Sequence, residues 1–299
     1  MTDTERVERP LPWRVRRDRE TRAFLSPAVR ALAEELGVDP RTLLGRGRDG
    51  RVTREDVLAA GGRSTHDEVV PFNNVRKRAA VGLVASKRTA AHALTLVTAD
   101  YSAIEAVRSA RRRQFRDEEG FSLTYLPFVA RAVVDALHEY PLMNATVAPT
   151  GDGLMSHRAV HLGIAVDLDY QGLVVPVVHD AEGLRLRALA RAVHDVATRA
   201  RAKQLTPDDL AGGTFTITNP GASGTWISFP IINQPQVGIL STDGVSKQVV
   251  VDDRGRVGIA PLGHLCLTFD HRALDGAYSG AFLGCVQAIV ERRDWAVEL

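Results

Sequence analysis

Lysine, cysteine and long hydrophobic runs are all scarce in this sequence of 299 residues. Only four of its 38 basic residues are lysines, and 36 acidic residues leave a formal net charge of +2. Because that charge is so small, it gives no reason to expect nucleic acid or a membrane surface as a partner. Both cysteines, Cys266 and Cys285, lie in apolar segments, which is typical of reduced core residues rather than of a disulfide framework.

Membrane and secretion signals are also missing. No apolar run approaches the length of a membrane span, and the arginine- and glutamate-rich start of the chain has no apolar signal core. We therefore expect a cytoplasmic protein. The chain is 44% hydrophobic, which is enough to bury a sizeable core in more than one domain.

Composition divides the chain into four parts. Residues 1–23 mix charges of both signs without an apolar period, which predicts a disordered arm. Residues 24–61 form a compact helical unit, residues 62–68 a short polar linker, and residues 69–299 one large domain. In that domain helices and strands interleave, and residues 160–178 have the pattern of a hairpin. We expect an α+β fold with a mixed sheet and helices on one side.

The small unit has recognisable helix signals. Ser26 and Pro27 supply an N-cap and a first-turn proline, and Thr53 with Asp56 three residues later predicts the start of a second helix. Between them, residues 45–50 match the dinucleotide-binding pattern G-x-G-x-x-G. No strand precedes this loop and no parallel-sheet unit surrounds it, so we interpret it as a glycine loop held between two helices.

The strongest candidate for chemistry is the segment 270–276, Asp-His-Arg-Ala-Leu-Asp-Gly. Apolar residues before it predict a buried strand, and apolar residues at helical spacing after it predict a helix. His271 therefore lies in a turn between strand and helix, and histidine is the side chain best suited to moving a proton near neutral pH. By spacing alone, its charged neighbours Asp270, Arg272 and Asp275 are equally compatible with a structural ion-pair network.

A second patch, residues 213–221, is a threonine-rich strand that leads into an Asn-Pro-Gly loop. If Thr218 met His271 across a channel, the pair could serve acyl transfer between thiols, with His271 as the base and the Thr218 hydroxyl donating to the oxyanion. Asp275 suits a buried ion pair with Arg76 or Arg272. The alternatives are an ordinary strand threonine and a local surface pair between Asp270 and Arg272.

Two other kinds of site receive little support. His264 and His271 have no accompanying cysteine or carboxylate set at ligand spacing, so we expect no metal site. Residues 221–224, Gly-Ala-Ser-Gly, lack the spacing of the G-x-S-x-G nucleophile elbow of hydrolases.

Three segments of the small unit resemble the peripheral subunit-binding domain of 2-oxo acid dehydrogenase complexes. They are Ser26-Pro27-Ala28-Val29-Arg30, Gly37-Val38-Asp39 and residues 50–57, Gly-Arg-Val-Thr-Arg-Glu-Asp-Val. The resemblance implies that Arg30 and Arg51 contact an acidic face of a dehydrogenase partner, the E1 or E3 component. The alternative is that both are solvated surface arginines.

The large domain is similar to the dihydrolipoamide acyltransferases, the E2 components of the same complexes, and more loosely to chloramphenicol acetyltransferase. Asp270-His271-Arg272-x-x-Asp275-Gly276 matches their active-site motif. Further segments match in family order: Arg76-Lys77, and residues 141–145, 163–167, 172–177, 213–219 and 230–236.

This resemblance implies a chloramphenicol acetyltransferase-like fold and a homotrimer that can build a larger core. Coenzyme A and dihydrolipoamide would enter a channel between subunits. His271 corresponds to the general base, Thr218 of the neighbouring subunit to the oxyanion donor, and Asp275 to an aspartate paired with Arg76.

The sequence departs from the family in one respect, because no lysine precedes Lys77 and family lipoyl domains carry lipoate on a lysine. We therefore expect the lipoate to be carried by another polypeptide. The predicted function is acyl transfer between a dihydrolipoyl thiol and coenzyme A. The alternatives are a noncatalytic scaffold of such a complex and a stand-alone coenzyme A-dependent acyltransferase for a small molecule.

Overall fold

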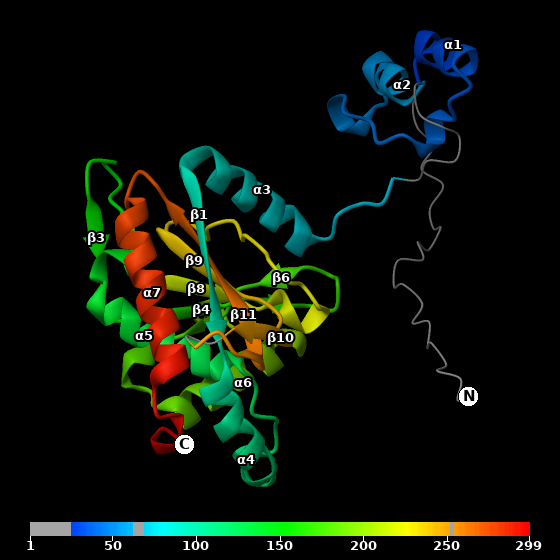
Figure 1. Cartoon of the computed structure of the whole chain (residues 1–299). Helices are drawn as coiled ribbons and strands as arrows, with labels where there is room; N and C mark the ends of the chain where they lie inside the picture. Colours follow the sequence, from blue (N-terminus) through cyan, green and yellow to red (C-terminus); the bar gives the residue numbers. More distant parts are fainter. Residues whose placement is uncertain (1–24, 62–68, 252–253) are drawn as a thin grey trace, which may run out of the picture. The chain divides into compact units, whose positions relative to one another are not determined.

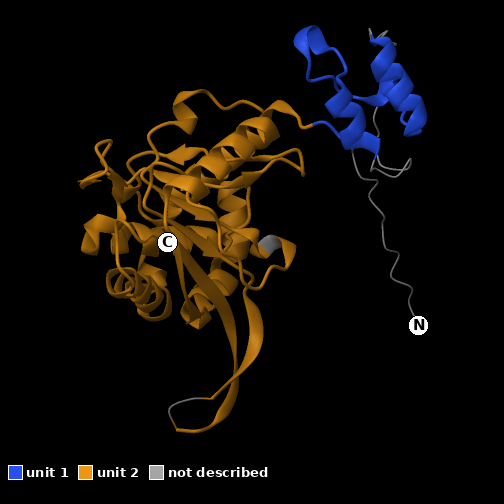
Figure 2. Cartoon of the chain, turned by 90° about the horizontal axis from the view of Figure 1, so that it is seen from above, with its two compact units in different colours: residues 1–71 blue, residues 72–299 orange. Residues whose placement is uncertain are grey.

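The computed structural model describes residues 25–61, 69–251 and 254–299. The chain forms two compact units, Met1–Pro71 and Phe72–Leu299 (Figures 1 and 2). The expected arm, residues 1–23, and the expected linker, residues 62–68, lie outside the described residues. No helix within the described ranges is long and apolar enough to span a membrane.

The first unit is a small helical module. Its elements are α1 (Pro27–Glu35), η1 (Pro40–Thr42), η2 (Arg48–Gly50) and α2 (Arg54–Gly61). The Ser26 hydroxyl accepts a hydrogen bond from the Val29 amide at 3.3 Å, which confirms the predicted N-cap. The core is small and consists of four buried residues, Val29, Ala33, Val52 and Val57.

Asp56 organises the glycine loop of this module. Its buried carboxylate accepts hydrogen bonds from the Thr53 amide and hydroxyl, both at 2.8 Å, and from the Arg46 amide at 3.1 Å. The bonds from Thr53 and Arg46 hold the pKa of Asp56 below its usual range. The backbone at Gly45 is packed directly against that of residues 50 and 51, where a Cβ would not fit. The glycines thus serve packing within the loop.

A seven-stranded mixed sheet forms the centre of the second unit. Its strand order is β1-β11-β9-β8-β4-β7, with β10 also paired to β11. The pairs β4–β8 and β8–β9 are parallel and the remaining ones antiparallel. The bounds are β1 (His92–Asp100), β4 (Leu162–Ile164), β7 (Val177–Val178), β8 (Phe215–Thr218), β9 (Gly238–Thr242), β10 (Ser246–Val251) and β11 (Val257–Asp270).

Two short hairpins accompany the sheet: β2 (Ala145–Val147) with β3 (Leu154–Ser156), and β5 (Val166–Asp167) with β6 (Leu173–Val174). The pairs β5–β6 and β4–β7 together form the hairpin expected over residues 160–178. Asp169 and Tyr170 both have positive φ in its turn.

Helices cover one face of the sheet. This layer consists of α4 (Ser102–Glu119), α5 (Leu126–Glu139), α6 (Leu186–Arg201) and α7 (Gly276–Arg292), and α3 (Asn74–Thr89), also in the second unit, lies outside it. The short 3₁₀ turns are η3 (Pro141–Met143), η4 (Ala181–Gly183), η5 (Asp208–Leu210), η6 (Pro220–Ser223) and η7 (Trp295–Val297). Buried residues of α4 to α7 join those of the sheet in one continuous core. The expected α+β fold with a mixed sheet is confirmed.

Helix α3 does not belong to that layer. Its Ser86 hydroxyl donates to the Ile232 carbonyl at 2.6 Å, and Ala90, Ile232 and Ile239 form a separate small core. Apolar side chains nearby remain exposed, with Leu94 at 53% and Leu96 at 40%. We call the sheet face that carries Leu94 and Leu96 the open face.

The C-terminal turn η7 closes the helical side of the core. The Trp295 side chain is 1% exposed, its indole N–H donates to the Val290 carbonyl at 3.1 Å, and its ring packs edge-on against Phe128. The Arg293 guanidinium lies over the same ring, 5.2 Å from its centroid. One aromatic side chain therefore joins the end of the chain to α5 and α7.

We expect Trp295→Ala to lower the free energy of unfolding by about 3–5 kcal/mol, because it opens a large cavity in this core. Val297→Ala is the matched control, since Val297 lies in the same turn but is 70% exposed. Urea unfolding at one fixed protein concentration measures both. Equal midpoints for the two variants would contradict the central role of Trp295.

Candidate active site

The segment that carries His271 has the predicted strand–turn–helix form. Strand β11 ends at Asp270, whose carbonyl accepts hydrogen bonds from the amides of Ala273 and Leu274. Helix α7 then begins at Gly276, with the Asp275 carboxylate accepting from the Tyr278 amide at 2.9 Å as its N-cap. The His271 side chain is exposed, and its ring lies 5.6 Å from that of Phe269.

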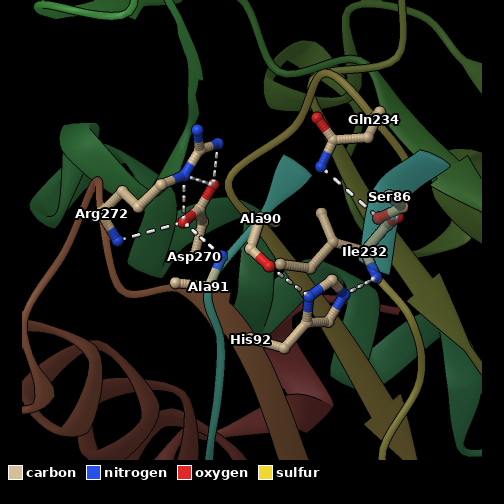
Figure 3. Close-up of polar contacts among 8 residues, drawn as sticks. All are labelled: Ser86, Ala90, Ala91, His92, Ile232, Gln234, Asp270 and Arg272. Carbon is tan, nitrogen blue, oxygen red and sulfur yellow. Dashed lines mark hydrogen bonds and ion pairs between the residues drawn. The ribbon is translucent and has the colours of Figure 1, made fainter. Parts of the chain in front are cut away.

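Asp270 is the anchor of this turn (Figure 3). Its side chain is 1% exposed. Its carboxylate accepts hydrogen bonds from the Ala91 amide at 3.1 Å and from the Arg272 amide at 3.0 Å, and it forms an ion pair with the Arg272 guanidinium at 2.6 Å. Between these two partners, the His271 amide donates to the Ala91 carbonyl at 2.8 Å. The backbone on both sides of the imidazole is thus fixed to the start of β1.

The same contacts set the charge state of Asp270. Burial alone would raise its pKa, but the Arg272 guanidinium and the amides of Arg272 and Ala91 hold the pKa below its usual range. Asp270 is therefore an anion at neutral pH, and its charge is matched by Arg272. Because the Asp270 side chain is buried, Asp270 and Arg272 do not form the simple surface pair that was one of the two alternatives from the sequence.

In the described part of one chain, Asp275 forms neither of the expected ion pairs. Arg272 binds Asp270, and Asp275 caps α7. Arg76 lies in the first turn of α3, whose 16 residues span about 24 Å, whereas the last turn of α3 leads to Ala91 beside His271. The Arg76 guanidinium instead donates to the Tyr170 carbonyl at 3.4 Å. The length of α3 therefore keeps Arg76 away from Asp275 within one chain.

Thr218 and His271 lie in different parts of one chain. Thr218 is the half-buried last residue of β8. In the sheet register it pairs with Ser241 on β9, and Ser241 pairs with Cys266 on β11. Asp270 lies four residues beyond Cys266, so Thr218 is two strands across and about 14 Å along the strands from the end of β11. A single subunit does not bring the hydroxyl and the imidazole together.

His92 is a participant that sequence reasoning missed. It lies opposite Asp270 in the β1–β11 pairing. Its Nε2 accepts the Ile232 amide at 3.2 Å, so Nδ1 carries the proton and donates to the Ala90 carbonyl at 3.1 Å (Figure 3). His92 thus connects residues 230–236 to the His271 turn. Only the strand register, which composition does not reveal, could have identified it.

Two further predictions from the sequence concern the partner-binding arginines of the first unit and the lack of a metal site. Arg30 on α1 and Arg51 after η2 are both exposed. Among the residues that the structure describes, no group of three or more His, Cys, Asp or Glu side chains could hold a metal ion.

Comparison with protein families agrees with this geometry. A model of the catalytic domain of 2-oxoacid dehydrogenases acyltransferases matches residues 64–296, and one of the e3 binding domain matches residues 23–58. The chain belongs to this acyltransferase family. The matched regions contain the His271 turn and both exposed arginines, so the acyltransferase carries its catalytic and binding modules in one polypeptide.

Three similar proteins illustrate the relationship. The acyltransferase is 33% identical to the lipoamide acyltransferase component of the branched-chain alpha-keto acid dehydrogenase complex of Bacillus subtilis, over 93% of this chain and 73% of that one. It is 35% identical to the dihydrolipoyllysine-residue acetyltransferase component of the pyruvate dehydrogenase complex of Corynebacterium glutamicum, over 92% of this chain but only 45% of that one.

The third is the crystal structure of dihydrolipoamide acetyltransferase from Azotobacter vinelandii. It is 31% identical and has a TM-score of 0.74 over 78% of this chain and 95% of that one. In that protein, a serine, a histidine and an asparagine have been investigated for their roles in the catalytic mechanism.

The Asp270 anchor predicts a specific pH dependence in the acyltransferase. Because the folded-state pKa of Asp270 is lowered, its ionised form stabilises the fold at a pH above about 4, and this contribution is lost as the pH falls through the folded-state pKa. Asp270→Asn should cost about 1–3 kcal/mol at pH 7, since buried donors lose their acceptor. Its stability should also change less than that of the wild type between about pH 5 and 2.

Urea unfolding across this pH range makes the measurement. Asp117→Asn on α4 removes an exposed carboxylate and should follow the wild type. Parallel pH profiles for Asp270→Asn and the wild type would show that Asp270 is not the anchor.

Proposed function

We propose that this protein transfers an acyl group between a dihydrolipoyl thiol and coenzyme A in a 2-oxo acid dehydrogenase complex. The observation that carries the proposal is the exposed His271 imidazole, presented on a backbone fixed by Asp270 and Ala91. In the Azotobacter vinelandii relative, the asparagine of the catalytic mechanism follows the histidine by four positions, as Asp275 follows His271. The serine of that mechanism precedes the histidine by 52 positions, and Thr218 precedes His271 by 53.

His271 acts as the general base of this reaction. An imidazole nitrogen takes the proton of the attacking thiol, whose ordinary pKa is about 8.5. The thiolate forms a new C–S bond to the thioester carbonyl carbon, and the carbonyl oxygen becomes an oxyanion. Its collapse breaks the old C–S bond, and the departing thiolate takes the proton back from the imidazolium. The reaction runs in either direction with the same residues.

Thr218 supplies the hydroxyl that donates to the oxyanion. Because Thr218 and His271 are far apart in one chain, the hydroxyl comes from the neighbouring subunit of a homotrimer. Exposed apolar side chains support such an assembly. They are Val81, Leu83 and Val84 on α3, Leu94 and Leu96 on the open face, and Trp226, Ile227 and Phe229 after η6. Exposed apolar groups of this extent are typical of association surfaces.

The β10–β11 hairpin offers a second surface for assembly. It extends beyond the rest of the second unit (Figure 2). Val249 lies opposite Ile259 and Val251 opposite Val257, so all four share one face, and each is 68–74% exposed. An apolar strand pair of this kind is stabilised by packing against another subunit.

The first unit recruits a dehydrogenase component, E1 or E3, through Arg30 and Arg51. Its match to the e3 binding domain and the exposure of both guanidinium groups support this role. The lipoyl group is carried outside these 299 residues, because none of the four lysines lies in the first unit or before it.

Acyl transfer to free dihydrolipoamide tests the proposed chemistry. We expect activity with one of acetyl-, succinyl- or branched-chain acyl-CoA. His271→Ala should lower kcat by about 10²–10⁴-fold, and Thr218→Ala by about 10²–10³-fold. His194→Ala, which removes an exposed histidine on α6, should retain wild-type activity.

Mixing the two inactive variants tests whether the site is shared. Trimers assembled at random from equal amounts of His271→Ala and Thr218→Ala subunits should regain about a quarter of wild-type activity, because one site in four then combines both intact residues. No recovery after verified subunit exchange would refute a shared site. A folded but inactive wild type would instead favour the scaffold role, and activity confined to a small-molecule acceptor would favour a stand-alone enzyme.

Charge reversal tests the docking surface. Arg30→Glu and Arg51→Glu should each weaken binding of the E3 or E1 component by about 2 kcal/mol or more, roughly 30-fold, because a like charge replaces a paired one. Arg111→Glu on α4 makes the same charge change in the other unit and should leave the affinity unchanged. Calorimetric titration measures all three, and equal affinities for all variants would exclude these arginines from the interface.

A further inference from the structure

The segment that follows Thr218 is held in place by a buried carboxylate that plays no part in the chemistry above. We call residues 219–229 the Thr218 loop. Asp243 follows β9 and is 3% exposed. Its carboxylate accepts hydrogen bonds from the Ser228 hydroxyl at 2.8 Å and from the Ser228 amide at 3.2 Å. Asp243 thus binds one loop residue through both a side chain and a backbone group.

Other contacts bring the loop and the end of β9 together. The Gly244 amide donates to the Thr225 carbonyl at 2.9 Å. A Cβ on Gly221 would lie 2.6 Å from the backbone of Asp243 and Gly244, so only glycine permits this approach. The Trp226 indole N–H donates to His264 on β11. The loop is therefore fixed at its start, its middle and its end.

The hydroxyl groups form a directed chain toward Asp243. The Ser228 and Ser241 hydroxyl oxygens lie 2.7 Å apart. Because the Ser228 proton is donated to Asp243, the Ser241 hydroxyl must be the donor to Ser228. Ser241 is the residue of β9 level with Thr218 in the parallel pairing. The chain Ser241–Ser228–Asp243 thus joins the strand beside Thr218 to the loop after it.

The groups that donate to the Asp243 carboxylate are the Ser228 hydroxyl and amide and the Cys266 thiol, whose sulfur lies 3.3 Å away. The Ser241 hydroxyl oxygen lies 3.4 Å from the carboxylate, but its proton is donated to Ser228. The contacts of the buried Asp243 carboxylate are hydrogen bonds, and burying a carboxylate without a cation is costly unless its oxygens are well hydrogen-bonded. An asparagine at this position would point its NH₂ group at donors and would release part of the loop.

We propose that Asp243, through Ser228, is a positioning residue that holds the Thr218 hydroxyl in the geometry needed to stabilise the oxyanion. This inference rests on the proposed function, in which Thr218 is the oxyanion donor. A hydroxyl that donates to a transition state must be held within a fraction of an ångström, and a misplacement of 1 Å can cost about 100-fold in rate. Asp243 itself does not contact the reacting atoms.

The test is a double-mutant cycle between Asp243→Asn and Thr218→Ala, with acyl-CoA and free dihydrolipoamide as substrates. Asp243→Asn alone should lower kcat by about 10–100-fold and change the KM for the acyl-CoA by less than about twofold. In the Thr218→Ala background, the same substitution should lower kcat by less than about twofold, because the hydroxyl that it positions is already absent.

Asp209→Asn is the matched control. Asp209, in η5, also binds one loop residue through a backbone and a side-chain group, accepting from the Thr206 amide at 2.7 Å and the Thr206 hydroxyl at 2.9 Å. Unlike Asp243, it forms an ion pair as well, with Arg199 at 2.7 Å. It should lower stability without lowering kcat. If Asp243→Asn does not fold, as judged by circular dichroism and sedimentation, Ser228→Ala replaces it and should show the same loss of effect in the Thr218→Ala background.

Additive effects of Asp243→Asn and Thr218→Ala would overturn the inference, as would an unchanged kcat in folded Asp243→Asn. Both results leave the acyltransferase itself intact. An inactive wild type, or a Thr218→Ala variant as active as the wild type, would remove the role of Thr218 and this inference with it.

Discussion

The arrangement of the second unit depends on one buried carboxylate, Asp270, at the end of its longest strand. Asp270 joins the end of β11 to the turn that follows it, through Arg272, and to the distant entry to β1, through Ala91. A carboxylate buried to this degree is stable only when its oxygens are satisfied, so these partners are required for the charge to remain. The exposed imidazole of His271 follows from this, since the residues on both sides of it are committed to structural contacts.

The separation of Thr218 from His271 connects the chemistry to assembly. Strand register fixes that separation, because β8 is parallel to β9 while β11 is antiparallel to it. No change of side-chain rotamer can cover about 14 Å along the sheet. A site that uses both residues must therefore be completed by a second subunit, and the exposed apolar residues of α3, β1 and the Thr218 loop provide a reason for subunits to associate. Under this proposal, the surface through which the subunits associate is also the surface on which the catalytic site is completed.

Local sequence patterns predicted much of this structure, and long-range contacts account for what they missed. Ser26, the Thr53–Asp56 pair and the strand–turn–helix around His271 were recognisable because each depends on neighbours within a few residues. The sequence left open whether Arg272 pairs with Asp270 or with Asp275, because both carboxylates lie within reach of it. Only the burial of the end of β11, which the sequence did not reveal, shows that the partner is Asp270 and that its carboxylate is buried. The Ser228, Ser241 and Asp243 network draws on separate segments, which resemble ordinary polar loop residues until the fold brings them together.

None of the four lysines lies in the first unit, so the proposed carrier of the lipoyl group lies outside these 299 residues. A lipoyl group attached to the same chain would reach the site at the high effective concentration that a tether provides. When the lipoyl group is carried elsewhere, that advantage must come from association with its carrier. The proposed role of the first unit is different, namely to dock a dehydrogenase component, and a core of four buried residues is sufficient for that role, because the unit would present Arg30 and Arg51 and would not enclose a substrate. Asp56 makes this unit rigid by holding the loop before Arg51. Asp56, Asp270 and Asp243 therefore have the same structural role: each is a buried carboxylate that holds a loop next to a residue with a proposed function in docking or catalysis.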